Sequence, residues 1–277
     1  MYPIISERST VGLDYINGSY KTASRQIFPL WKVLPTLGFY RFIFPIVLRA
    51  GIRAKQGKYD TTEWCKSSLE VLRALECIGT RVDVEGVEHF RELKGPCVFL
   101  SNHMSTLETF VLPVIIAAIK PLTFVVKESL LETPVFKYVM RSRHPVTVGR
   151  TNPREDLRAV LEGGTDRLKA GISLVIFPQT TRFLDFDAKT FNTIGIKLAK
   201  RAGVPVVPVA LRTDAWGNGR CLKDFGRMDP SRPVHFAFGE PLRIEDRGNE
   251  EHHEVIAFIR NKLDEWRERD KAPAVGP

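Results

Sequence analysis

The chain has 277 residues, of which 43% are hydrophobic and 26% charged. It is long enough to bury one ordinary core and too short to require several domains, so one globular domain with an appendage is expected. The net charge of +9 predicts an anionic partner, but charge alone does not choose between nucleic acid, a phospholipid surface and a phosphorylated small molecule.

The cysteines and the first residues indicate where the protein resides. The four cysteines are scattered, without a C-x-x-C pair: Cys65, Cys77, Cys97 and Cys221. This distribution favours reduced thiols over a disulfide or zinc framework. The opening stretch "MYPIISERSTVGLDY" lacks the basic and then apolar layout of a secretory signal. We therefore expect the protein to stay in the compartment where it is made.

An apolar and aromatic segment covers residues 27–52, within an N-terminal region of residues 1–60. It contains three prolines and is interrupted by three basic residues: Lys32, Arg41 and Arg49. A spanning helix needs about 20 predominantly apolar residues, and no uncharged run here is that long. The pattern favours a helical segment at a membrane interface, with Trp31 and Tyr40 suited to the headgroup level. The alternative is an ordinary pair of core helices.

The region 61–270 shows alternating helix and strand patterns. Residues 61–79 form a predicted amphipathic helix that stops at a glycine. Short apolar runs follow, at RVDVEGV, PCVFL, LTFVV, PVTV, SLVIF, VPVVPVAL and VHFAFG. Helical stretches alternate with them, at 107–119, 134–140, 153–170, 191–202 and 250–270. This predicts an α/β domain with a largely parallel central sheet flanked by helices, and a loose tail at 271–277.

Three polar clusters follow strands of this predicted sheet. His103 comes after the strand that ends at Leu100, Arg150 comes after PVTV, and the stretch 178–182 comes after SLVIF. Functional groups of such sheets collect in the loops at the carboxyl ends of the strands. We therefore expect the three clusters to meet in one cleft.

The first cluster, "SNHMSTLETF", contains a histidine and a carboxylate five residues apart. A histidine such as His103 is the natural general base for a hydroxyl, and a carboxylate such as Glu108 would orient it and stabilise its protonated form. Ser105 and Glu108 also fit S-x-x-E, a capping box at the start of the next helix. The glutamate could serve both purposes.

The other two clusters each supply an arginine. In "FPQTTR" two hydroxyl residues and Arg182 follow a buried strand, and in "VTVGR" Arg150 follows a short one. The planar guanidinium group suits phosphate, and backbone N–H groups of such a turn can add to an anion site. Taken singly, either arginine could be an ordinary surface charge.

Together the blocks resemble the glycerolipid acyltransferases typified by 1-acylglycerol-3-phosphate acyltransferase. That family has, in order, N-H-x-x-x-x-D, a short strand ending in arginine, F-P-E-G-T-R and V-P-V/I-V/I-P. Here the order is "NHMSTLE", "VTVGR", "FPQTTR" and "VPVVP", with Lys127 in the position of a lysine between the first two blocks. The resemblance extends over about residues 98–211.

The resemblance implies transfer of a fatty acyl group from acyl-CoA or acyl-ACP to the free hydroxyl of a lysophospholipid, without a further cofactor. It makes His103 the base and Glu108 its orienter. The residues expected at the substrate are Asn102, Lys127, Arg150, Gln179, Thr180, Thr181 and Arg182. The basic charge and the 27–52 segment then both fit attachment to the cytoplasmic side of an anionic membrane.

Two departures from the family pattern leave the acceptor open. Glu108 replaces an aspartate and is one methylene longer, a change that we expect activity to survive. Gln179 and Thr180 replace a glutamate and a glycine, which removes a carboxylate and restricts the turn. Lysophosphatidate is the default acceptor, with another lysolipid or a hydroxylated amino-acid lipid as the alternative. A non-catalytic lipid-binding protein on the same fold is a further alternative.

The sequence offers little support for other partners. No metal-binding cluster is visible, because the histidines are dispersed apart from His252 and His253 in the charged last helix. No basic run interleaved with aromatics indicates a nucleic-acid module. We therefore expect neither a bound metal nor nucleic acid.

Overall fold

A computed structural model describes residues 11–23, 26–179, 181–219 and 225–271. Within them an eight-stranded sheet has the order β1-β2-β8-β7-β3-β6-β4-β5. Its strands are β1 (Tyr20–Lys21), β2 (Val82–Glu85), β3 (Val98–Ser101), β4 (Leu122–Lys127), β5 (Val146–Val148), β6 (Ser173–Ile176), β7 (Val206–Arg212) and β8 (Val234–Phe238).

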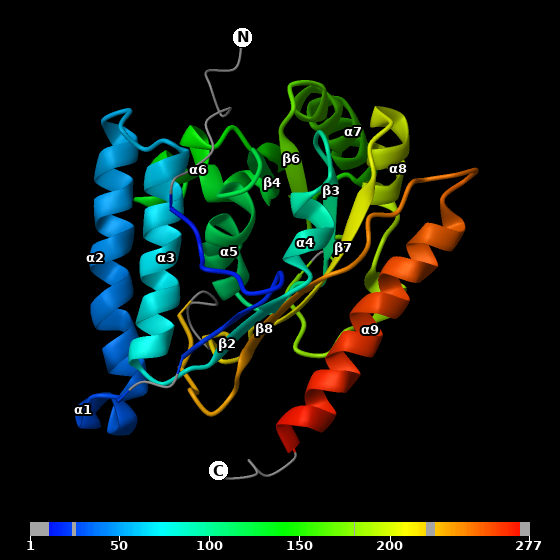
Figure 1. Cartoon of the computed structure of the whole chain (residues 1–277). Helices are drawn as coiled ribbons and strands as arrows, with labels where there is room; N and C mark the ends of the chain where they lie inside the picture. Colours follow the sequence, from blue (N-terminus) through cyan, green and yellow to red (C-terminus); the bar gives the residue numbers. More distant parts are fainter. Residues whose placement is uncertain (1–10, 24–25, 180, 220–224, 272–277) are drawn as a thin grey trace.

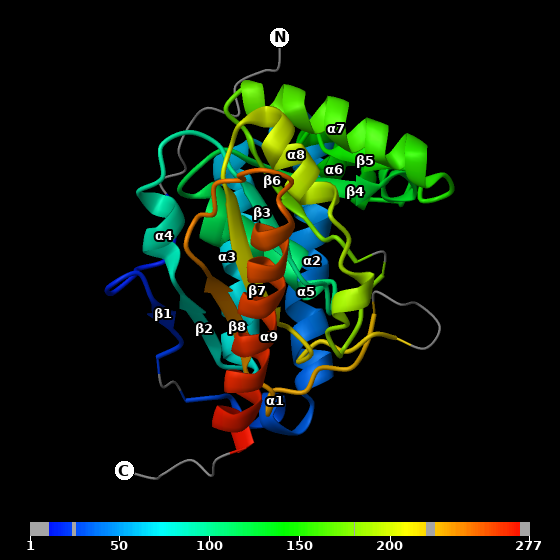
Figure 2. The same ribbon diagram turned by 90° about the vertical axis from the view of Figure 1, so that its right-hand side faces the viewer.

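Helices cover both faces of this sheet. They are α1 (Pro29–Val33), α2 (Pro35–Lys55), α3 (Thr61–Cys77), α4 (Val87–Arg91), α5 (Leu107–Leu112), α6 (Phe136–Ser142), α7 (Pro153–Lys169), α8 (Ile194–Ala202) and α9 (Asn249–Lys271). A π-helical turn continues α5, and two short 3-10 turns lie at Glu128–Leu131 and Ala188–Thr190. Figures 1 and 2 show α3 and α5 on one face and α7, α8 and α9 on the other, with α2 packed outside α3.

The predicted α/β class is confirmed, but the sheet is mixed. Strands β2 and β8 pair in parallel, as do β3 with β6 and β7, and β4 with β5 and β6. Strands β1 and β8 run antiparallel to their partners β2 and β7. The strand β1 was not predicted from the sequence. The carboxyl ends of β3, β4, β5, β6 and β7 therefore lie along one edge.

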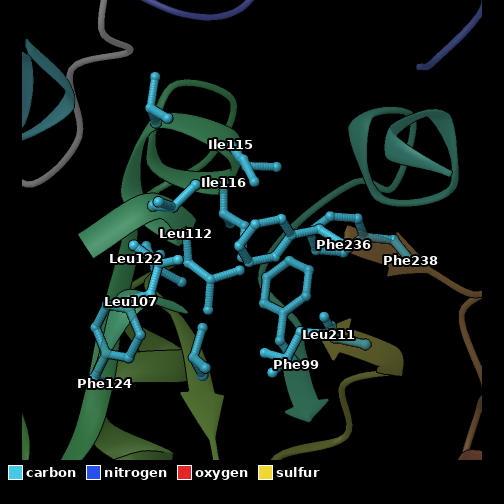
Figure 3. Packing of buried hydrophobic residues seen from close by; sticks show 14 of the residues in the cluster. Phe99, Leu107, Leu112, Ile115, Ile116, Leu122, Phe124, Leu211, Phe236 and Phe238 are labelled. Carbon is cyan, nitrogen blue, oxygen red and sulfur yellow. The ribbon is translucent and has the colours of Figure 1, made fainter. Parts of the chain in front are cut away.

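The core fixes where β3 ends. Phe99 points toward the layer of α4 and α5, where Figure 3 shows it packed among aromatic and aliphatic side chains. Leu100 points to the other face, against α8. A Cβ at Gly195 would come within 2.1 Å of the Leu100 side chain, so only glycine allows this close approach. Both faces of β3 are thus held rigidly just before His103, as expected for a strand buried on two sides.

The helix predicted at 61–79 is confirmed as α3. The Asp60 side chain caps its first turn by accepting a hydrogen bond from the backbone N–H of Glu63 at 2.8 Å. Gly79 follows its end with φ of +95°, a conformation that favours glycine. The helix buries its apolar side, including Leu72 and Leu75.

Helix α2 has two apolar sides. One side is buried and includes Phe39, Ile43, Ile46 and Ala50. The outward side of α1 and α2 exposes a row of large apolar residues at helical spacing: Leu30, Val33, Leu34, Leu37, Phe44, Leu48 and Ile52. We call this row the α1–α2 apolar face. In the described part of the chain, every helix is too short or too polar to cross a membrane.

Candidate active site

Asn102 joins two neighbouring strands directly before the histidine. Its side-chain amide donates to the carbonyl of Leu211 at 2.8 Å, and its side-chain oxygen accepts from the Leu211 N–H at 3.0 Å. The side chain is 1% exposed. Both of its polar ends are therefore used to fasten the end of β3 to β7. Asn102 thus supports the loop that holds His103, and its expected contact with the substrate stays a prediction.

His103 lies at the carboxyl edge of the sheet, in the loop between β3 and α5. Its Nδ1 is 2.7 Å from Oε1 of Glu108, and its ring stacks on that of Phe177 at a centroid distance of 4.4 Å. The side chain is 16% exposed. Because a carboxylate only accepts, Nδ1 carries the proton and the lone pair of the neutral ring lies on Nε2.

The Glu108 carboxylate is fully buried and serves both of its expected purposes. Its Oε1 accepts from His103 Nδ1 and also from the backbone N–H groups of Met104 and Ser105, at 2.8 and 3.0 Å. Its Oε2 accepts from the hydroxyl of Thr213 at 2.6 Å and lies 3.0 Å from the hydroxyl of Ser105. The same carboxylate thus closes the first turn of α5 and orients the histidine.

These contacts decide the charge of Glu108. Burial alone would raise the pKa of this carboxyl group, but hydrogen bonding and charge attraction from His103, and the hydrogen bond from Thr213, outweigh it. The net effect lowers the pKa of Glu108 below its ordinary value. The group is therefore ionised at neutral pH and can stabilise positive charge on the imidazole ring.

The segment after β6 lies beside the loop that holds His103. The Gln179 side chain, 1% exposed, lies 3.3 Å from the backbone N–H of His103 and donates to the Thr190 hydroxyl at 3.2 Å. The backbone N–H of Phe183 donates to the His103 carbonyl at 2.9 Å. Gln179 thus faces inward and contacts the loop that holds His103, and its expected place at the acceptor stays a prediction. Thr181 is exposed, and Thr180 lies outside the described residues.

Two arginines face the same edge. Arg150 follows β5 with φ of +60°, and the Asp156 carboxylate secures this turn by accepting from the backbone N–H groups of Gly149 and Arg150. The Arg182 guanidinium donates to the Thr106 hydroxyl in the histidine loop. Partial burial lowers the pKa of Arg150; attraction to Asp156 opposes this shift, and a smaller repulsion from Arg182 adds to it. The two positive charges are therefore close enough to interact, and an anion between them would relieve the repulsion.

The remaining expected residue, Lys127, is the exposed last residue of β4. It stands at the same edge of the sheet as His103, two strands away. The convergence of the His103, Arg150 and Arg182 clusters on one edge agrees with the sequence-based expectation. Among the described residues, the structure brings together no group of three His, Cys, Asp or Glu side chains that could hold a metal ion.

Sequence reasoning missed two groups that complete the site. Thr213 follows β7 and contacts Glu108, and Asp156 on α7 shapes the Arg150 turn. The sequence could have indicated Thr213, because this residue comes directly after a predicted strand, as the other site residues do. Nothing in the local pattern distinguishes Asp156 from the other acidic residues of its helix.

Comparison with known proteins shows which family the central part of the chain matches. Residues 81–212 match the family model described as Acyltransferase. They include His103, Glu108, Arg150 and Arg182. Residues 81–212 thus form a domain of the acyltransferase family, which confirms the resemblance seen in the sequence.

Two named relatives match part of the chain in sequence. The chain is 35% identical over 175 residues to the 1-acyl-sn-glycerol-3-phosphate acyltransferase of Pseudomonas aeruginosa, covering 63% of each chain. It is 30% identical over 131 residues to the chloroplastic enzyme BAT2 of Brassica napus, covering 47% of this chain and 37% of that one. The chain thus matches less than two thirds of the length of either relative.

A solved structure shares the fold. The 1-acyl-sn-glycerophosphate (LPA) acyltransferase PlsC from Thermotoga maritima superposes with a TM-score of 0.64 at 22% identity. The match covers 86% of this chain and 97% of that one. The likeness extends beyond residues 81–212 to most of the α/β architecture.

Proposed function

We propose that the protein transfers a fatty acyl group from a thioester to the free hydroxyl of a lysophospholipid. The observation that carries this proposal is the His103–Glu108 pair, with Nε2 left for a substrate proton, beside the arginine pair at the same sheet edge. The names of the relatives from Pseudomonas and Brassica support 1-acylglycerol-3-phosphate as the acceptor.

The chemistry follows from the two ring nitrogens of His103. Nε2 takes the proton of the acceptor hydroxyl as its oxygen attacks the thioester carbonyl. The tetrahedral intermediate collapses, the carbon–sulfur bond breaks, and the thiolate of CoA or of acyl carrier protein leaves with the proton from Nε2. The ionised Glu108 stabilises the imidazolium that exists between these two transfers. No acyl group becomes attached to the protein.

The arginine pair supports a phosphate group as the headgroup of the acceptor. A phosphate monoester carries nearly two negative charges and several acceptor oxygens, so it can bind both guanidinium groups. Arg150 and Arg182 come from turns after different strands. Asp156 accepts from the backbone N–H of Arg150, and the Arg182 guanidinium donates to the Thr106 hydroxyl. Lys127 would add a more distant positive charge. Acceptors without a phosphate would bring no negative charge to the two guanidinium groups.

We expect a panel of acceptors to show this preference directly. With one acyl-CoA and one acyl-ACP as donors, lysophosphatidate should be acylated faster than a monoacylglycerol of the same chain. Arg150→Gln should raise KM for lysophosphatidate roughly 10- to 100-fold, as for a lost hydrogen bond to a charged group, and leave the weak monoacylglycerol reaction unchanged. Product masses and initial rates measure both effects.

Arg158→Gln is the matched control, because Arg158 is an exposed arginine of α7 paired with Glu162. It should behave as wild type. Equal losses with both acceptors in Arg150→Gln would contradict the role of Arg150 in phosphate binding. A panel in which only an amino-acid lipid is acylated would contradict lysophosphatidate as the acceptor.

We also propose that the α1–α2 apolar face rests on the membrane that holds the substrate. Leu37 and Phe44 are 59% and 53% exposed there, and Arg41 lies between them on the same face. Apolar side chains with basic neighbours suit insertion at the headgroup boundary of an anionic bilayer. The face lies near the site, since the Tyr40 hydroxyl donates to Gly226 in the loop that also approaches Met104 through Asn218.

Vesicle binding tests this orientation. The protein should sediment with vesicles that contain anionic lipid and much less with purely zwitterionic ones. Leu37→Glu combined with Phe44→Glu should release most of it. Ile16→Glu, at an even more exposed apolar position before β1, should bind as wild type. Equal loss in this control, or preference for duplex DNA over vesicles in a salt titration, would contradict the proposed membrane face.

A further inference from the structure

Thr213 is the first residue after β7 and is fully buried. Its hydroxyl donates to Oε2 of Glu108 at 2.6 Å, the shorter of the two side-chain contacts at that oxygen. The Ser105 hydroxyl, at 3.0 Å from the same oxygen, has only one hydrogen and also lies 3.0 Å from the Thr213 carbonyl. Thr213 is therefore the hydroxyl whose proton is committed to Glu108.

The position of Thr213 is fixed by the strand that precedes it. β7 pairs in parallel with β3, with Val209 opposite Ser101, and Asn102 bonds to both backbone groups of Leu211. These contacts set the register between the histidine loop and the loop after β7. The hydroxyl of Thr213 is consequently held against the carboxylate by the sheet itself, not by a mobile loop.

We propose that Thr213 is a positioning residue for the acyl transfer, and this inference rests on the proposed function. Its hydroxyl holds the Glu108 carboxylate in the rotamer that places Oε1 against His103 Nδ1. The carboxylate oxygens differ in their partners. Oε1 accepts from His103 and from the backbone N–H of Met104, whereas Oε2 accepts from the Thr213 hydroxyl; the Ser105 N–H lies within 3.1 Å of both oxygens. Loss of the Thr213 donor would let the carboxylate turn and weaken its hold on Nδ1. His103 would then present its Nε2 lone pair less often.

The test compares Thr213→Val, which keeps the shape and removes the hydroxyl, with Thr213→Ser, which keeps it. Thr213→Val should lower kcat by about 10-fold with KM for donor and acceptor nearly unchanged, and Thr213→Ser should restore most of the rate. Thr123→Val is the matched control. Thr123 is also fully buried and donates to the Arg143 carbonyl at 2.8 Å, away from Glu108.

A second readout does not need turnover. The ring ¹⁵N shifts of His103, assigned with His103→Ala, report how much of the neutral ring carries its proton on Nδ1. That fraction should fall in Thr213→Val and stay at the wild-type value in Thr213→Ser and Thr123→Val. An unchanged fraction in Thr213→Val overturns the proposal, whatever its turnover. A wild-type protein that acylates no acceptor contradicts the proposed function instead, and the ¹⁵N comparison still decides the role of Thr213.

Discussion

His103→Ala should lower kcat for lysophospholipid acylation by roughly 10²–10⁴-fold, the usual contribution of a general base. The variant should fold, because Glu108 keeps its donors from Met104 and Thr213 when the imidazole is removed. The ring is partly exposed and packs mainly on Phe177, so its loss creates little buried cavity. Initial rates with saturating acceptor, together with the thermal unfolding midpoint, measure the two expectations.

The matched control for that substitution is His253→Ala, at an exposed position on α9. It should retain wild-type turnover. A folded His103→Ala variant with wild-type turnover would remove His103 as the base. If the wild-type protein itself binds lipid but never consumes a thioester with any acceptor, the proposed chemistry is wrong and the protein is better described as a non-catalytic lipid-binding protein.

The alternation of strand and helix was readable from the sequence because each buried strand is a short apolar run between polar turns. The same pattern located the candidate site, since the residues after β3, β5 and β6 share one edge of the parallel part of the sheet. The direction of β8 was not foreseen. Its connection from β7 contains no helix in the described residues, and parallel strands ordinarily need such a crossover.

The inward orientation of two polar side chains could not be read from local sequence. Asn102 directly precedes His103 in the chain and Gln179 lies in the FPQTTR block, and the family pattern suggested contact with substrate for both. Asn102 instead meets the backbone of β7, and Gln179 meets His103 and Thr190. Each partner comes from another strand or turn, so the burial that decides the role arises only when the sheet assembles.

The Glu108 series separates orientation of the histidine from capping of the helix. Glu108→Asp keeps the charge and should retain substantial activity, whereas Glu108→Ala should lose most of it, roughly 10²-fold or more. The alanine variant also leaves the N–H of Met104 and the hydroxyl of Thr213 without their acceptor, at a cost of roughly 1–3 kcal/mol each in the free energy of unfolding. Rates per folded molecule therefore have to be compared. Equal rates in Glu108→Asp and Glu108→Ala would leave Glu108 as a helix cap only.

Glu108→Gln adds a pH test of the same carboxylate. The pKa of Glu108 is lowered in the folded protein, because the donors around it outweigh the effect of burial, so the unfolded chain binds its proton more readily. The stability it contributes is thus fully present above the unfolded value of about 4.3 and is lost as the pH falls through the lower folded value. Urea unfolding should show a difference in the free energy of unfolding between wild type and Glu108→Gln that does not shrink from pH 7 to pH 5 and that shrinks below about pH 4. A gap that shrinks already between pH 7 and pH 5 would mean that the buried carboxyl group is protonated near neutrality, and it could not then stabilise the imidazolium of His103.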